Sequence, residues 1–193
     1  LASASPRRRE LLNQIGLAHE VLLVPAPPGE GEPQHPGESS ADYVQRTARD
    51  KAMRGRDWMR AHAMPVLPLL APDTTVILAG EVLGKPADRD DAIRILRALS
   101  GASHEVHTAV AVCSGDRLLE AVSITEVHMR ALQDDEISRY CDSGEPFGKA
   151  GAYGIQGLAG TFVSHIAGSY TGVTGLPLFG TANLLRAAGI QVP

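Results

Sequence analysis

Hydrophobic residues recur at helical spacing in several stretches of the chain, bracketed by residues that start and stop helices. Leu11, Leu12 and Ile15 form one such stripe between Ser5-Pro6 and Gly16. Ser and Pro favour the first positions of a helix, and Gly favours its end. A repeat of three and four residues is typical of a helix with one buried face. The expected helices span residues 5–16, 40–63, 87–101, 134–142 and 176–188.

Apolar runs and alternating patterns predict strands in other segments. Val or Thr occupies every second position from Val106 to Val112, as in a strand with one buried face. A turn at Gly115-Asp116 follows, so this strand is expected to form a hairpin with the next. The expected strands span residues 1–4, 20–24, 66–71, 76–79, 106–112, 118–132 and 161–166. No repeat or linker divides the chain, so residues 1–193 are interpreted as one domain.

The stretch from Leu70 to Pro86, LAPDTTVILAGEVLGKP, carries the clearest candidate chemistry. Asp73, Glu81 and Lys85 are expected at the ends of apolar strands, where a core does not need them. Two carboxylates and an ammonium are what a site for a metal ion and a phosphate group requires. We therefore expect the rest of the chain to place phosphate-binding groups and a base pocket around this stretch.

Three arginines, Arg7 to Arg9, lie in the first turn of the first expected helix. Cations there oppose the helix dipole, at a cost of roughly 0.3–1 kcal/mol each when nothing compensates them. A bound anion would make these arginines stabilising instead of costly, because free backbone N–H groups and arginines together bind phosphate. The alternative is a solvated basic turn that contacts acidic neighbours.

Lysine is rare in this chain, and arginine supplies nearly all of its positive charge. The three lysines are Lys51, Lys85 and Lys149, and each lies in a segment of interest. Lysine offers a compact charge with three donors, although three residues are few enough for chance to explain their placement.

A glycine-rich stretch, residues 143–157, contains Lys149, Tyr153 and Gln156. Frequent glycine allows a ligand to approach the backbone closely. The amide of Gln156 can both donate and accept hydrogen bonds at a base edge. The alternative is an ordinary glycine-rich turn.

The composition is that of an ordinary soluble domain, with 44% hydrophobic residues, 21% charged residues and a net charge of −4. It lacks the basic excess of a nucleic-acid binder and the long apolar run of a membrane span. Cys113 and Cys141 lack metal-binding spacing, so we expect reduced thiols and a cytoplasmic protein. His104 and His107 lie three apart in one strand and face opposite sides, so we interpret both as structural or surface residues.

Four motifs follow in order: SASPRR from Ser3 to Arg8, DTT from Asp73 to Thr75, GEVLGKP from Gly80 to Pro86, and KAGAYGIQG from Lys149 to Gly157. Together they resemble the Maf family of nucleoside triphosphate pyrophosphatases, over essentially the whole chain. The resemblance implies an α/β fold similar to that of the inosine triphosphatases. In that fold, a two-lobed mixed sheet with flanking helices surrounds a central cleft. Family members are often cytoplasmic homodimers, so a homodimer is one expectation here.

The resemblance also implies roles for individual residues. Asp73 matches the family's catalytic proton acceptor, and Arg7, Thr74 and Gln156 match positions that govern substrate choice. A divalent metal ion, Mg²⁺ or Mn²⁺, would be held by the carboxylates of Glu32, Asp73 and Glu81. The other expected substrate-binding residues are Ser3, Ser5, Arg8, Lys51, Lys85 and Lys149.

The fourth motif resembles that of the family branch acting on dTTP and UTP. We therefore expect hydrolysis of these nucleotides, or of modified pyrimidine nucleotides, to the monophosphate and pyrophosphate. The alternatives are a pyrophosphatase for 7-methyl-GTP or purine nucleotides, and a non-catalytic nucleotide-binding regulator of cell division. Gly31 and Gly148 favour the regulator, because the family usually has a carboxylate at each position.

Overall fold

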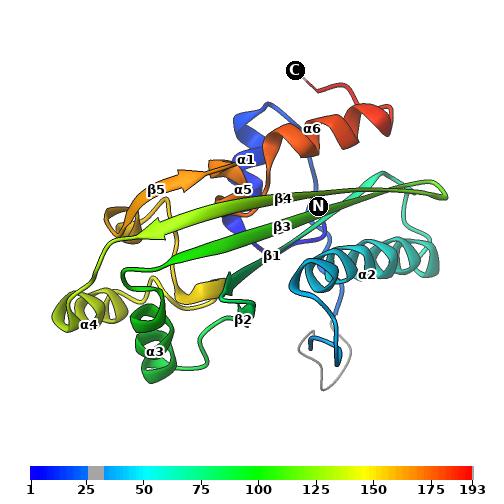
Figure 1. The fold of residues 1–193 in the computed structure, drawn as a ribbon. Coiled ribbons are helices and arrows are strands. Elements are labelled where there is room, and N and C mark those ends of the chain that lie inside the picture. Colours follow the sequence, from blue (N-terminus) through cyan, green and yellow to red (C-terminus); the bar gives the residue numbers. More distant parts are fainter. Residues whose placement is uncertain (26–32, 193) are drawn as a thin grey trace.

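The computed structural model describes residues 1–25 and 33–192, so Glu32, an expected metal ligand, lies outside the described residues. The described chain is built on a sheet of five strands: β1 (Leu69–Leu78), β2 (Glu81–Leu83), β3 (Ser103–Ser114), β4 (Arg117–Met129) and β5 (Val163–Ala167). Their order in the sheet is β2-β1-β3-β4-β5 (Figure 1). Every neighbouring pair of strands is antiparallel.

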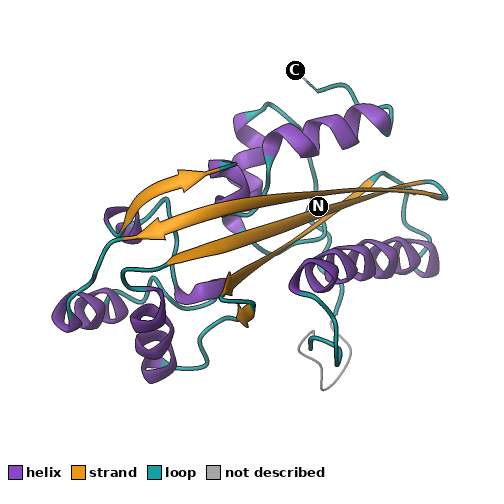
Figure 2. Ribbon diagram, viewed as in Figure 1, coloured by secondary structure: helices purple, strands orange, loops and turns teal. Residues whose placement is uncertain are grey.

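Helices lie on both sides of this sheet (Figure 2). On one face, α2 (Ser40–Ala61) packs Val44, Ala48 and Ala52 against Ala109 and Ala111 of β3. The opposite face is covered by α1 (Pro6–Gln14), α3 (Arg89–Leu99) and α6 (Leu178–Ala187), which contribute to two further clusters of buried side chains. The remaining helices are α4 (Asp134–Asp142), η1 (Ala150–Ala152), η2 (Leu158–Thr161) and α5 (Tyr170–Thr174).

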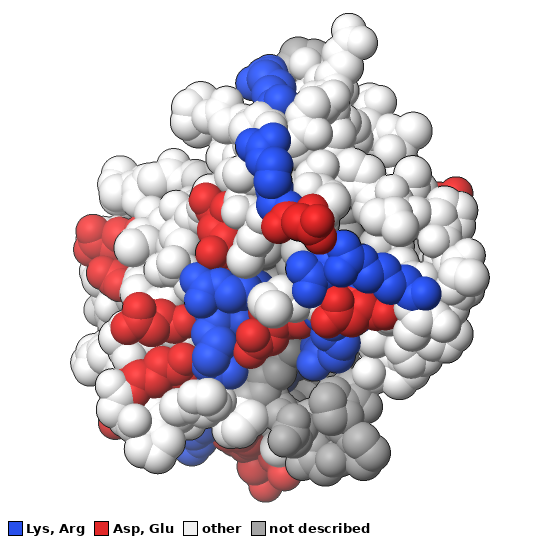
Figure 3. Space-filling model, turned by 90° about the vertical axis from the view of Figure 1, so that its right-hand side faces the viewer, with Lys and Arg blue, Asp and Glu red and all other residues white. Residues whose placement is uncertain are grey.

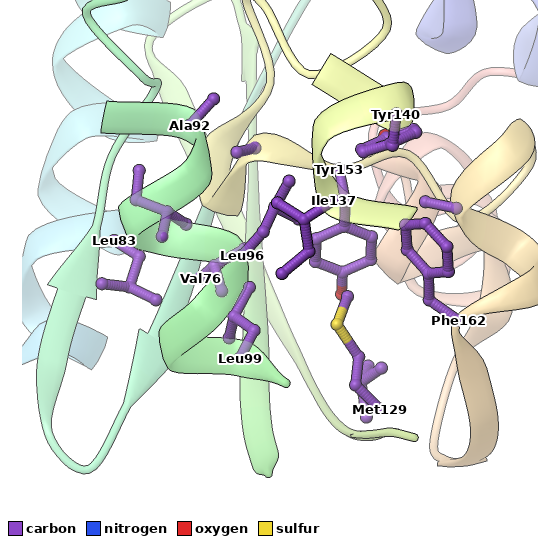
Figure 4. Close-up of a cluster of buried hydrophobic side chains, with 14 of the residues drawn as sticks. Val76, Leu83, Ala92, Leu96, Leu99, Met129, Ile137, Tyr140, Tyr153 and Phe162 are labelled. Atoms are coloured by element: carbon purple, nitrogen blue, oxygen red, sulfur yellow. The ribbon is translucent and has the colours of Figure 1, made fainter. Parts of the chain in front are cut away.

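The largest cluster of buried side chains joins α3 and α4 to the glycine-rich segment. Figure 4 shows the ring of Tyr153 among Ile137, Met129 and Phe162. Leu96 of α3 is fully buried in the same cluster. Burying a side chain of this size contributes about 1.5–3 kcal/mol, so the core anchors the segment that carries the fourth motif.

The expected helices are confirmed, and so is an α/β fold with flanking helices. Three details differ from expectation. All four ladders in the described residues are antiparallel, where a mixed sheet was expected. Short turns at Gly80 and Gly115 return the chain directly in two of them, β1–β2 and β3–β4. Residues 1–4 and 20–24 are not strands, although Leu1 exchanges backbone bonds with Glu20 O and Leu22 N. β1 runs unbroken through Asp73, which therefore lies within a strand and not at its end.

No helix in the described part of the chain is both long and apolar enough to cross a bilayer. Figure 3 shows basic and acidic side chains lying side by side on one face of the molecule. Ion pairs connect α2 to the β3–β4 hairpin, from Arg49 to Glu120 and from Arg60 to Asp116. Exposed pairs of this kind contribute at most about 1 kcal/mol each, so the core holds the fold together.

Candidate active site

A cleft of about 600 Å³ lies along the outer edge of β1. β2 pairs only with residues 76–78 of β1, and Ala2 N bonds to Leu70 O further back along the strand. Among the described residues, no strand covers the outer edge of β1 between these points. Successive side chains on a strand point to opposite faces. At an uncovered edge, both Asp73 and Thr74 can therefore line the same cleft, and both do.

Helix α2 supplies two partners for the carboxylate of Asp73. Lys51 Nζ donates a hydrogen bond to Oδ1 at 2.6 Å, and Thr47 Oγ1 donates to Oδ2 at 2.7 Å. Thr47 and Lys51 are four residues apart and so lie on one face of the helix. The side chains of Lys51 and Asp73 remain 23% and 15% exposed. The carboxylate is thus held on both oxygens while keeping lone pairs for a ligand in the cleft.

Helix α1 brings arginines to the other side of the cleft. Arg8 donates through Nε to Gly175 O at 2.9 Å, through Nη1 to Ser3 Oγ at 2.8 Å, and through Nη2 to Thr74 Oγ1 at 3.2 Å. Among the described residues, Arg7 makes one long bond, from Nε to Thr174 O at 3.4 Å. Arg8 therefore ties three segments together, whereas most donors of Arg7 remain available to a ligand.

Burial lowers the pKa of Arg7, and nearby Glu10 opposes that effect. A guanidinium with a pKa somewhat below its usual value is still fully charged near neutral pH. Partial burial strengthens its interaction with an anion, because water screens the charge less. Ser5 lines the cleft beside Arg7, and Ser5 N donates to Ser3 Oγ at 3.3 Å.

The glycine-rich segment forms the far wall of the cleft. Gly151 has a φ of +67°, and a Cβ there would lie 2.8 Å from Val76 Cγ2, so glycine is required. Lys149 Nζ donates to the carbonyl of Glu145. Burial and repulsion from Arg7 lower the pKa of Lys149. The exposed side chain of Gln156 lines the cleft.

Positive charge dominates this cleft. All three lysines of the chain line it together with three arginines, whereas Asp73 is the one carboxylate among the described lining residues. The basic lining residues are Arg7, Arg8, Lys51, Arg54, Lys85 and Lys149. The whole chain has a net charge of −4, so this concentration of cations is local. It suits a ligand with several negative charges.

Comparison with known proteins identifies the family. A family model described as Maf-like protein matches residues 1–188. The chain belongs to the Maf family. Among similar Maf proteins is one named dTTP/UTP pyrophosphatase from Bordetella parapertussis, which is 74% identical across the whole chain and 93% of the relative. Relatives of the same name from Bordetella avium and Chromobacterium violaceum are 72% and 53% identical, again across the whole chain and 96% of each relative.

The structure brings together ten of the twelve site residues predicted for this Maf protein. Glu81 begins β2 with an exposed side chain and does not line the cleft, and Glu32 lies outside the described residues. The ten that line the cleft are Ser3, Ser5, Arg7, Arg8, Lys51, Asp73, Thr74, Lys85, Lys149 and Gln156.

The side chains at the cleft indicate how the expected divalent metal ion could be held. No group of three or more His, Cys, Asp or Glu side chains in the described part of the chain is arranged to hold a metal ion. Mg²⁺ is commonly bound through one or two carboxylates together with substrate phosphates and water. Asp73 can supply one such carboxylate at the cleft. The described residues therefore fit a metal ion that arrives with the phosphates.

Three residues near the site were not predicted from the sequence to belong to it. Arg54 lines the cleft three residues after Lys51, so helical spacing could have indicated it. Thr47 bonds Asp73, and Glu145 accepts the bond from Lys149. Thr47 lies four residues before Lys51, so helical spacing could have indicated it as well, but its bond to Asp73 depends on how α2 packs against β1. The contact of Glu145 with Lys149 spans only four residues of an irregular segment, where no periodic pattern indicates it.

Proposed function

We propose that this Maf protein hydrolyses dTTP and UTP to the corresponding monophosphate and pyrophosphate. The charge of the cleft carries the proposal: six basic side chains face it, with one carboxylate among the described lining residues. A nucleoside triphosphate carries several negative charges in a short chain. The name dTTP/UTP pyrophosphatase borne by relatives up to 74% identical supports the choice of nucleotide.

The triphosphate would lie between α1 and α2. Arg7, Lys51 and Lys85 would contact its oxygens, since charge-assisted bonds to phosphate are stronger than neutral ones. Arg8 would hold Ser3 and Thr74 in place beneath it. A bound Mg²⁺ or Mn²⁺ would neutralise phosphate charge in the transition state, with Asp73 as a protein ligand.

The reaction would be the attack of water on the α-phosphorus. The bond from the α-phosphorus to the bridging oxygen breaks, and pyrophosphate leaves with that oxygen. Asp73 would orient the water and accept its proton, at the position that Lys51 and Thr47 hold. General-base assistance typically accelerates such a step by about 10²–10⁴-fold. Basic side chains around the leaving group would stabilise the charge that develops on it.

The base would lie against the glycine-rich wall. Gln156 there presents an amide with both donors and an acceptor. A site built on such hydrogen bonds discriminates against bases that leave its polar groups unpaired. We assign pyrimidine selection to Gln156 together with nearby backbone groups.

A panel of nucleotides tests the proposed function. The protein is incubated with dTTP, UTP, GTP or 7-methyl-GTP and Mg²⁺ or Mn²⁺, and pyrophosphate and monophosphate are quantified together. Equal amounts of both products from dTTP and UTP, in excess over the purine nucleotides, support the proposal. Preferred cleavage of 7-methyl-GTP or GTP indicates the purine alternative. Nucleotide binding without product indicates the non-catalytic regulator.

A cytoplasmic location and a homodimer complete the proposal, and both rest on the family resemblance. Cys113 and Cys141 are free and buried, as is usual for proteins of reducing compartments. Light scattering coupled to size-exclusion chromatography would measure the assembly directly. A mass of one chain at micromolar concentration would exclude the dimer.

A further inference from the structure

We propose that Glu145 is a positioning residue for base selectivity. Its hydrogen bonds hold both ends of the loop that carries Gln156. Glu145 does not line the cleft itself. The inference rests on the proposed function, since it takes Gln156 as the side chain that reads the base. It adds a residue that acts on selectivity only through Gln156.

Glu145 joins three separate parts of the structure. Its Oε1 accepts a hydrogen bond from Tyr140 Oη of α4 at 3.0 Å, and its Oε2 accepts from Leu158 N of η2 at 2.9 Å. Its backbone carbonyl accepts the bond from Lys149 Nζ. The chain from Lys149 to Leu158 therefore begins and ends on one residue, and Gln156 lies within that span.

The carboxylate also replaces a helix cap that the local sequence lacks. The first N–H groups of a helix have no partner within it. Gly157 stands at the N-cap of η2 and has no side chain to accept them. Glu145 accepts from Leu158 N and, at 3.4 Å, from Ala159 N. A charged carboxylate forms stronger hydrogen bonds with these N–H groups than a neutral acceptor would.

Tyr140 fixes the carboxylate from the other side. Its side chain is buried, with 3% of the residue exposed. Burial and the nearby Glu145 raise the pKa of Tyr140, so its hydroxyl remains a neutral donor. This bond connects the loop to α4 and to the core around Tyr153 and Phe162.

Gly157 shows how closely the carboxylate packs on the loop. A Cβ at Gly157 would lie 2.4 Å from Oε2 and 2.5 Å from Oε1 of Glu145. The φ of Gly157 is −107°, which other residues also adopt. Glycine is therefore needed for space and not for backbone conformation. The exposed Gln156 directly precedes Gly157, so the backbone position of Gln156 depends on the contact between the loop and the Glu145 carboxylate.

The test compares selectivity in Glu145→Gln, Gln156→Ala and the double variant. The measured quantity is the ratio of kcat/KM for dTTP to kcat/KM for GTP. Glu145→Gln places an amide donor against the N–H donors of η2, and we expect the ratio to fall by about tenfold. Because Glu145 acts through Gln156, the double variant should have the same ratio as Gln156→Ala alone.

A second variant disturbs the same contact between the carboxylate and the loop without altering Glu145. Gly157→Ala would push the carboxylate from the loop, so its ratio should fall in the same direction. Gly180→Ala in α6 is the matched glycine control, since its Cβ would meet nothing closer than 3.8 Å. Glu120→Gln is the matched glutamate control, as Glu120 pairs with Arg49 outside the cleft. Both controls should keep the wild-type ratio.

Three outcomes would overturn the inference. Folded Glu145→Gln and Gly157→Ala variants could both keep the wild-type ratio. The double variant could show the product of the two single effects, which would make the residues independent. Gln156→Ala could itself leave the ratio unchanged while the wild type still cleaves dTTP. Glu145 could then not act on selectivity through Gln156, whereas the proposed hydrolysis of dTTP would be unaffected. A wild-type protein that releases no pyrophosphate from dTTP refutes the proposed function as well.

Discussion

Asp73 and Thr74 are neighbours on β1, yet they line one cleft from opposite faces of the sheet. The carboxylate of Asp73 bonds Thr47 and Lys51 of α2, whereas the hydroxyl of Thr74 bonds Arg8 of α1. The uncovered edge of β1 is what allows both side chains to reach the same ligand. A dipeptide in the uncovered stretch of β1 thus connects the two helices that would hold the triphosphate.

Replacing the carboxylate of Asp73 by an amide should abolish most of the activity. Asp73→Asn keeps the size of the side chain but removes its ability to accept a proton from water. We expect kcat for dTTP to fall by about 10²–10⁴-fold, while dTTP still binds in a calorimetric titration. Asp116→Asn is the control, because Asp116 lies on the hairpin turn and pairs with Arg60. An Asp73→Asn enzyme with near wild-type turnover would remove Asp73 from the mechanism.

The hydroxyl of Thr47 should matter for turnover more than for binding. Thr47→Val keeps the shape of this buried residue but removes the bond to Asp73 Oδ2. A hydrogen bond to a charged group is worth about 1.5–3 kcal/mol, so kcat should fall by about 10- to 100-fold with little change in KM. Thr47→Ser should recover most of the loss. Thr181→Val is the control, since the Thr181 hydroxyl is buried and has no hydrogen-bond partner within the described structure. Equal kinetics in Thr47→Val and Thr181→Val would exclude this role.

Arg7 and Arg8 should respond differently to substitution. Arg8→Lys breaks bonds to Ser3, Thr74 and Gly175 that one ammonium cannot replace. We expect it to lower the free energy of unfolding by about 1–3 kcal/mol. Arg7→Gln should leave thermal unfolding unchanged and raise KM for dTTP about tenfold. Arg9→Lys, at an exposed residue outside the cleft, is the control. Identical melting temperatures for all three variants would show that Arg8 is not structural.

Much of this fold follows from local patterns, whereas the cleft depends on distant pairings. The stripe of Leu11 and Leu12 predicted α1 correctly because a helix is built from contacts within a few residues. The rarity of lysine indicated three residues that the structure brings to one cleft.

The placement of the acidic residues was harder to predict. Glu81 begins β2 with an exposed side chain, a position set by the tight turn after β1. The sequence suggested a strand end for Asp73, but pairing with Ala109 extends β1 through it. Contacts of Thr47 and Glu145 likewise join segments far apart in the chain, and hydrophobic periodicity does not report on such contacts.

Stability should fall in mild acid because of His104. Burial lowers the pKa of His104 to about 4, with a smaller contribution from His128. The unfolded state binds this proton near pH 6.5, so between about pH 6.5 and 4 the unfolded state binds more protons than the folded one. The stabilising contribution is complete above pH 6.5 and is lost as the pH falls.

Urea unfolding across this pH range tests that expectation. The wild type should lose about 2 kcal/mol between pH 6.5 and 5 through this group, and His104→Gln should remove that part of the slope. His35→Gln, at an exposed histidine, should behave as the wild type. An unchanged pH slope in His104→Gln would contradict the assignment.

Hydrolysis of dTTP in ¹⁸O-labelled water tests the central claim most directly. The reaction is run with the wild-type protein and Mg²⁺, and the products are separated and weighed by mass spectrometry. If water attacks the α-phosphorus, one labelled oxygen appears in dTMP and the pyrophosphate stays unlabelled. Label in pyrophosphate, or release of dTDP and orthophosphate, would contradict the account.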